Sequence, residues 1–228
     1  MPTGAMYPDV ARVKFDREVA NLAAQGEAFR RRGAFLLQVD YPRVVVVFAP
    51  PKLKPAPMIF AMMADYTDYD LQPPSIQFVD PFTYEPLTAA QLPTKMMRSI
   101  PHPPGQLNVP DLPAGAVVAQ GNAQLEVAAN GLGPMGFPWL SVPVVEHQAL
   151  LQDYGPDTIP FLCIAGVREY HQHPGHSGDP WELHRLTGAG SLVRLVGIVL
   201  AYAVEPVAGW AINMVPQLAI GYSPEPPE

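Results

Sequence analysis

The stretch DYDLQPPSIQFVDP, residues 68–81, decides the fold because it joins a turn to a strand in one short run. Pro73 and Pro74 lack the backbone N–H that a sheet needs, so they end the tyrosine-rich loop before them. The residues that follow, SIQFV (75–79), are predicted to form a strand. We expect Tyr66, Tyr69 and the proline pair to serve structure.

Three apolar runs precede this strand. They are AFLLQV (34–39), RVVVVFA (43–49) and MIFAMMA (58–64), and short proline-containing segments separate them. Their composition suits a pleated sheet, so the four runs together predict an antiparallel meander. Before the meander, apolar residues at helical spacing predict a helix over Asp16–Arg32, which Gly33 would close in a left-handed conformation.

Downstream, residues 83–145 are rich in Pro, Gly and Ala and are interpreted as an insertion. IPFLCIAGV (159–167) is predicted to be a further strand, and apolar spacing from Leu192 predicts an amphipathic helix with Ser191 as its N-cap. The tail over about 221–228 is expected to be mobile. We expect one α+β domain over 1–228, with a core over about 16–82 and 159–203.

Composition argues against several classes of partner. The net charge is −7 and only 15% of residues are charged, so no basic stripe is available for nucleic acid or an anionic membrane. The apolar run SLVRLVGIVLAYAV (191–204) contains Arg194 and is shorter than the roughly 20 residues of a membrane span. Cys163 is the single cysteine, and the start has no signal-peptide pattern. The expected location is the cytoplasm.

The order of these elements resembles the ubiquitin-conjugating-enzyme fold. The stretch at 68–81 is similar to the tyrosine, paired prolines and last strand of that fold, and HPGHSGDPW (173–181) is similar to its His-Pro motif. The segment CIAGVREYHQHPGHSGDPWELHR (163–185) also resembles bacterial proteins encoded beside ubiquitin-like proteins, among them the metal-binding CEHH family. The resemblance implies a conjugating-enzyme-like fold and ubiquitin-like partners.

One feature departs from that pattern. The cysteine of a conjugating enzyme follows the His-Pro motif, whereas Cys163 precedes His173 and Pro174. Apolar neighbours such as Phe161 and Ile164 also favour burial of the thiol, which a reactive cysteine avoids. We therefore expect no thioester at Cys163, although an active conjugating enzyme that uses this thiol stays an alternative.

The histidine-rich segment offers zinc ligands. If residues 163–173 formed an extended strand, alternate side chains would share one face and bring a thiol, a carboxylate and imidazoles together. These are ligand types that zinc accepts in tetrahedral geometry. The predicted metal set is Cys163, Glu169 and two of His171, His173 and His176, with His184 in reserve.

The same residues have plainer interpretations. Cys163 can be a small buried apolar residue, and His173 can hold a loop through a hydrogen bond to a backbone carbonyl. Asp179 is expected to shape a turn, and Trp181 is expected in the core or at an interface. The whole segment can also be a hydrogen-bonded polar loop, or an acid-base site without metal.

Three functions remain open from the sequence. The first is an accessory or atypical component of a bacterial ubiquitin-like modification pathway, which binds zinc and contacts a ubiquitin-like protein or its activating enzyme. The second is a conjugating enzyme with a thioester at Cys163. The third is a zinc-dependent hydrolase with Glu169 as general base. The environment of Cys163 distinguishes the second function from the first.

Overall fold

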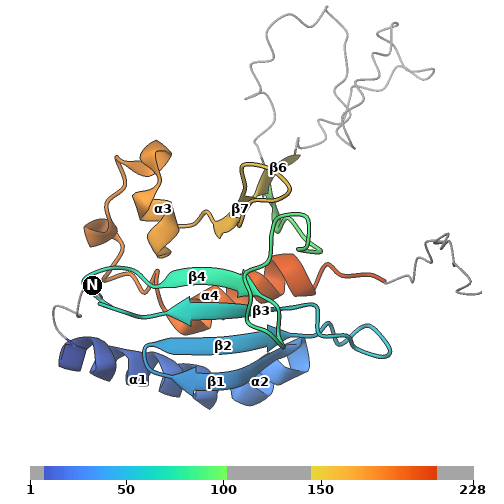
Figure 1. The fold of residues 1–228 in the computed structure, drawn as a ribbon, viewed down its shortest axis with the longest axis horizontal. Coiled ribbons are helices and arrows are strands. Elements are labelled where there is room, and N and C mark those ends of the chain that lie inside the picture. Colours follow the sequence, from blue (N-terminus) through green and yellow to red (C-terminus); the bar gives the residue numbers. More distant parts are fainter. Residues whose placement is uncertain (1–7, 102–144, 210–228) are drawn as a thin grey trace, which may run out of the picture.

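A computed structural model describes residues 8–101 and 145–209 (Figure 1). Its centre is an antiparallel sheet in the order β1-β2-β3-β4, which confirms the predicted meander. The strands are β1 (Ala34–Asp40), β2 (Arg43–Phe48), β3 (Phe60–Asp65) and β4 (Ser75–Val79). Because neighbouring strands follow each other in the chain, short connections suffice. The register places Val46 of β2 opposite Leu36 of β1 and Met62 of β3.

The N-terminal helical region consists of two helices, α1 (Pro8–Ala24) and α2 (Gly26–Arg32). The prediction of one helix over Asp16–Arg32 therefore missed the first turns and a break at Gln25. Gly26 follows the break, and glycine is a poor helix former. Gly33 ends α2 with a φ of 98°, so its predicted left-handed conformation is confirmed.

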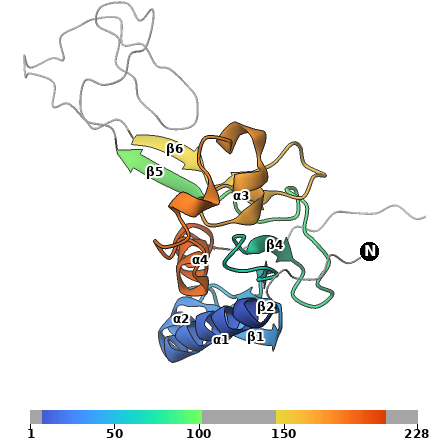
Figure 2. The ribbon, with the colours of Figure 1, turned by 90° about the vertical axis from the view of Figure 1, so that its left-hand side faces the viewer.

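The main core lies between the sheet and helices α1, α2 and α4 (Leu192–Val199). Figure 2 shows these helices gathered on one side of the sheet. Alternate residues of β2 serve the two faces: Val44 and Val46 join the main core, whereas Val45 and Val47 form a smaller apolar cluster. Ser191 accepts the Arg194 N–H at 3.4 Å, so the predicted N-cap of α4 is confirmed.

After β4 the described chain contains mostly short elements. They are β5 (Met97–Pro101), β6 (Val145–Ala149), β7 (Leu151–Gln152), β8 (Phe161–Leu162), α3 (Arg168–Gln172), the 3₁₀ turns η1 (Pro174–His176) and η2 (Trp181–Leu183), and the π-helical η3 (Leu200–Val204). The predicted strand over 159–167 is wrong beyond its centre, since only Phe161–Leu162 pair, with β7. Most of the predicted insertion, residues 102–144, and the tail at 221–228 lie outside the described residues.

The loop before β4 anchors the histidine-rich segment to the sheet. Arg168, the first residue of α3, donates its backbone N–H to the Pro74 carbonyl at 2.9 Å and its Nε to the Pro73 carbonyl at 3.2 Å. Trp181 is buried and donates its indole N–H to the Asp70 carbonyl at 3.0 Å. The proline pair thus turns its carbonyls toward α3, and the predicted structural role of Trp181 in the core is confirmed.

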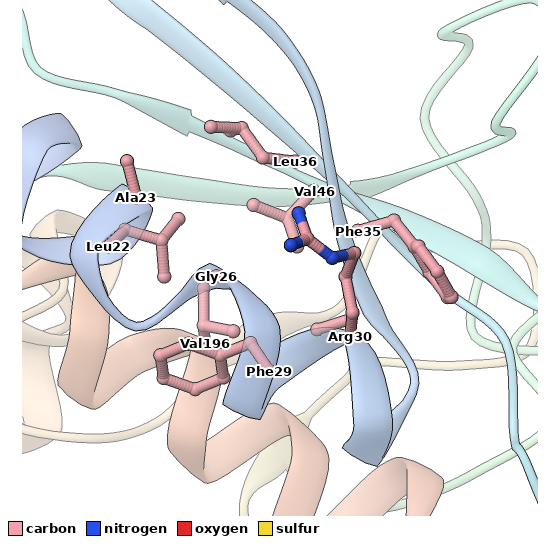
Figure 3. A pocket seen from close by; sticks show the side chains of 10 residues that line it. Leu22, Ala23, Gly26, Phe29, Arg30, Phe35, Leu36, Val46 and Val196 are labelled. Carbon is pink, nitrogen blue, oxygen red and sulfur yellow. The ribbon is translucent and has the colours of Figure 1, made fainter.

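Two further features bear on partners. Among the described residues, no helix combines the length and apolar character needed to cross a membrane. An apolar cavity of about 260 Å³ lies between α1, α2, α4, β1 and β2, with side chains such as Leu22, Phe29 and Val46 on its walls (Figure 3). Arg30 is its charged lining residue.

Candidate functional site

The chain turns sharply between Cys163 and the histidines. Gly166 has a φ of +103°, and a Cβ there would lie 2.2 Å from the Ala189 carbonyl oxygen, so the backbone can pass only as glycine. Helix α3 begins two residues later. The extended strand considered for residues 163–173 is therefore wrong, and period-two spacing does not bring Cys163, Glu169 and the histidines onto one face.

Cys163 and His176 form a close thiol–imidazole pair. The Cys163 Sγ lies 3.2 Å from His176 Nε2, although thirteen positions separate the two in the chain. The 3₁₀ turn after Pro174 carries His176 back over α3, where its ring stacks on Tyr170 with centroids 4.0 Å apart. Cys163 is half-buried, so the burial that argued against a thioester at this thiol is only partial. Its neighbours Leu162 and Ile164 are buried instead.

Asp179 holds the rest of the segment together. Its carboxylate accepts a hydrogen bond from the Tyr170 hydroxyl at 2.7 Å and one from His184 Nε2 at 2.5 Å. Its backbone carbonyl accepts from His171 Nδ1 at 2.8 Å. The sequence predicted that Asp179 shapes a turn. In the structure Asp179 also connects α3 to the segment after η2.

His171 and His173 differ in how fully their nitrogens are engaged. Since the Asp179 carbonyl can only accept, His171 Nδ1 carries the proton, and His171 Nε2 accepts the Gly166 N–H at 3.3 Å. Both nitrogens of His171 are therefore used. His173 Nδ1 accepts the Gly175 N–H at 3.1 Å, and its Nε2 lies 3.4 Å from the Gln152 side-chain nitrogen. The sequence predicted a bond from His173 to a backbone carbonyl, and the structure instead shows a bond from a backbone N–H to His173.

Glu169 connects α3 to the sheet. One carboxylate oxygen accepts a short hydrogen bond from the Ser75 hydroxyl, and the other accepts the Ile76 N–H at 3.3 Å. Both partners belong to β4. The carboxylate is thus engaged at the start of β4, away from the thiol–imidazole contact.

The predicted metal ligands fall into three sets. Cys163 and His176 are in contact, and the His173 ring centroid lies 5.3 Å from that of His176. His171 and His184 gather around Asp179, and Glu169 faces β4. Within residues 8–101 and 145–209, no three His, Cys, Asp or Glu side chains form a group that could hold a metal ion. Of the predicted zinc ligands, Cys163 and His176 are in direct contact, and His173 lies next to His176.

Electrostatics of the site favour a protonated thiol and an ionised carboxylate. Burial raises the pKa of the Cys163 thiol above its usual value. Burial, followed by the hydrogen bond to Asp179, raises the pKa of Tyr170 to about 12. Hydrogen bonds from His184 and then Tyr170 lower the pKa of Asp179. Near neutral pH, Cys163 therefore needs a base before it can act as a nucleophile.

Sequence reasoning missed Tyr170 and Gln152 as members of the site. Tyr170 contacts His176 by stacking and Asp179 by a hydrogen bond, so it links the two parts of the segment. Gln152 comes from β7, which pairs with the strand just before Cys163. Neither residue carries a spacing signal, because the first depends on α3 and the second on a tertiary strand pair.

The fold and the site define an α+β protein that presents a half-buried thiol–imidazole pair on a histidine-rich segment beside its meander sheet. The chain belongs to the Y4jH family, whose model it matches over residues 6–145 and 140–207. It is 37% identical over 221 residues to the uncharacterized protein y4jH of Sinorhizobium fredii (strain NBRC 101917 / NGR234). That match covers 97% of this chain and 94% of the relative.

Proposed function

We propose that this protein is an atypical, conjugating-enzyme-like component of a bacterial ubiquitin-like modification pathway, with the Cys163–His176 pair as its chemical centre. The fold assignment is supported by a helix, a four-stranded meander, a Pro-Pro turn and a His-Pro segment in the order that the resemblance implies. The observation that carries the chemistry is the 3.2 Å contact between the Cys163 Sγ and His176 Nε2.

The pair suits transfer of an acyl group between thiols. His176 would take the proton from the Cys163 thiol, whose pKa burial has raised. The resulting thiolate would attack the carbonyl carbon of a ubiquitin-like protein held as a thioester on its activating enzyme. The new S–C bond forms as the old one breaks, and the proton passes from His176 to the departing thiolate. No oxidant or further co-reactant is required.

Zinc binding is the second candidate, and a separate observation favours it. His176 contacts Cys163, and the His173 ring centroid lies 5.3 Å from that of His176, so a thiol and two imidazoles, ligand types that zinc prefers, are neighbours in the segment. A coordinated sulfur is a poor acyl acceptor, so the role in this case would be accessory. Glu169 would stay with β4 in either role, which argues against its use as the base of a hydrolase.

A charging reaction tests the proposal. The full chain would be incubated with ATP and with an activating enzyme and ubiquitin-like protein from its own gene neighbourhood, then run on a non-reducing gel. The wild type should form an adduct that thiol reagents remove. Cys163→Ser should form either an adduct that resists these reagents or none at all. His176→Gln should form the thiol-sensitive adduct about a hundredfold more slowly. His147→Ala is the matched control, since His147 is exposed and pairs with Ser99 on β5.

The metal content of the same preparations separates the two candidates. Protein with no transition metal and a thiol-sensitive adduct supports transfer at Cys163. Close to one zinc per chain, lost in Cys163→Ser, together with no adduct, would replace the transfer role by the accessory one. A preparation with neither adduct nor metal would contradict the proposal as a whole.

A further inference from the structure

The two outer strands of the sheet differ in what covers them. On β4, the Ile76 N–H donates to Glu169 at 3.3 Å and the Phe78 carbonyl accepts the Leu87 N–H at 2.9 Å. The other outer strand is β1 (Figure 1). Among the described residues, the backbone of β1 forms hydrogen bonds with β2 alone. One row of its N–H and C=O groups is therefore open to a further strand.

The exposed side of β1 is apolar. Every residue from Phe35 to Asp40 is exposed, and four of them, Phe35, Leu36, Leu37 and Val39, are large apolar residues. Leu37 is the most exposed of the four, at 52%, and it is the extra residue of a bulge, without a partner on β2. Lysine and proline are common means of keeping an outer strand apart from other chains. β1 contains neither, and its bulge adds a leucine instead of a charge.

The apolar cavity of Figure 3 adjoins the same strand. Leu36 lines it from β1, and Leu22 and Phe29 line it from the helices. Since Leu36 is also 40% exposed, it stands at the rim of the cavity. A strand paired with β1 would lie along this rim and would remove apolar surface of the strand and of the rim from water. Burial of that surface favours association.

The charges at the two ends of β1 indicate which strand fits. Three arginines, residues 30–32, precede β1 and share two carboxylates, those of Glu27 and Glu205, so this end keeps a positive charge. Asp40 ends the strand, and its carboxylate has no hydrogen bond or ion pair among the described residues. The strand is therefore positive where it begins and negative where it ends.

Such a strand is complementary to a reversed copy of itself. An antiparallel pair of identical strands brings the start of each beside the end of the other, as in a twofold dimer. The arginines of one copy then lie near Asp40 of the second copy, whereas a parallel pair would put like charges together. We infer that β1 pairs antiparallel with β1 of a second copy, so that two chains form a dimer with one continuous sheet.

Sedimentation velocity on the full chain tests the inference. Between about 1 and 300 µM the wild type should pass from monomer to dimer, with a Kd of about 1–100 µM, because a single strand pair is a small interface. Leu37→Lys puts a charge on the open edge and should raise the Kd at least about tenfold. Leu186→Lys is the matched control: Leu186 is 91% exposed but lies in the histidine-rich segment, so the Kd should not change. A wild type that stays monomeric throughout this range, or that assembles beyond a dimer, would overturn the inference.

Hydrogen exchange locates the interface without any variant. Amides of β1 should exchange more slowly at the upper end of the same concentration range, and amides of β4, whose outer groups are already bonded, should not change. Exchange in β1 that is independent of concentration while a dimer forms would place the interface elsewhere and overturn the inference.

A charge variant tests the orientation of the two strands. Asp40→Arg would meet the arginines of the second copy and should raise the Kd about threefold or more, because like charges across a strand pair repel. Asp9→Arg is the matched control, since Asp9 lies on α1 and not on the open edge, so the Kd should not change. A dimer that Asp40→Arg leaves unchanged or strengthens would contradict the antiparallel pairing.

Discussion

The thiol of Cys163 is controlled by two opposing influences. Burial raises its pKa and keeps it protonated near neutral pH, whereas His176 Nε2 lies 3.2 Å from the sulfur and accepts the thiol proton when the imidazole carries its own proton on Nδ1. A raised pKa means that the folded state holds the proton more tightly than the unfolded chain. This contribution to stability is present below the pKa of the unfolded thiol and is lost as the pH rises through the folded value.

The pH dependence of alkylation follows from this balance. Because the folded pKa lies above the usual value of 9.0, the rate with iodoacetamide should rise through pH 9 without reaching a plateau. Cys163 is the single cysteine, so the mass of the intact protein reports the reaction directly. His176→Gln should lower the rate near pH 7.5. A plateau below pH 8 would instead indicate a thiolate stabilised by a cation or a metal ion.

The regular elements were predictable where local chemistry and burial agree. Val44, Val46 and Phe48 face one core and Val45 and Val47 the other, so β2 is apolar throughout and could be recognised without a partner. Gly33 is similar, since its neighbours require a left-handed turn between α2 and β1. Helix α3 has five residues and no buried side chain, so its sequence carries no amphipathic signal.

Gly33→Ala should destabilise the protein by about 2 kcal/mol or more. The left-handed φ of 98° costs a residue with a Cβ about 1–2 kcal/mol, and that Cβ would lie 2.3 Å from the Ala49 carbonyl oxygen. Gly197→Ala is the matched control, because nothing lies within 4 Å of a Cβ there and alanine favours helix α4 by about 1 kcal/mol. Urea denaturation measures both changes. A Gly33→Ala variant with a free energy of unfolding equal to or above that of the wild type would show that the turn does not require Gly33.

At the scale of the whole molecule, the sheet and the histidine-rich segment differ in how much they bury. All of Val44–Phe48 are at most 4% exposed, whereas Trp181 is the one buried residue between 171 and 188. The position of that segment depends on bonds of Asp179 within the segment. It also depends on the bonds of Gln152 and Arg168, which join parts of the chain farther apart in sequence. Such contacts leave no periodic pattern in the sequence. The residue types therefore indicate where the site lies, but not which of its side chains contact one another.

This difference predicts two levels of local stability. Hydrogen exchange measured by mass spectrometry should show β2, β3 and α4 exchanging only through near-global unfolding, because their amides lie in the main core. Residues 174–188 should exchange orders of magnitude faster, since few apolar side chains hold them. If zinc binds Cys163, His173 and His176, adding it should slow exchange around 173–176 and leave β2 unchanged. Equal protection in β2 and in 174–188 without metal would contradict this division, since the segment would then open only together with the core.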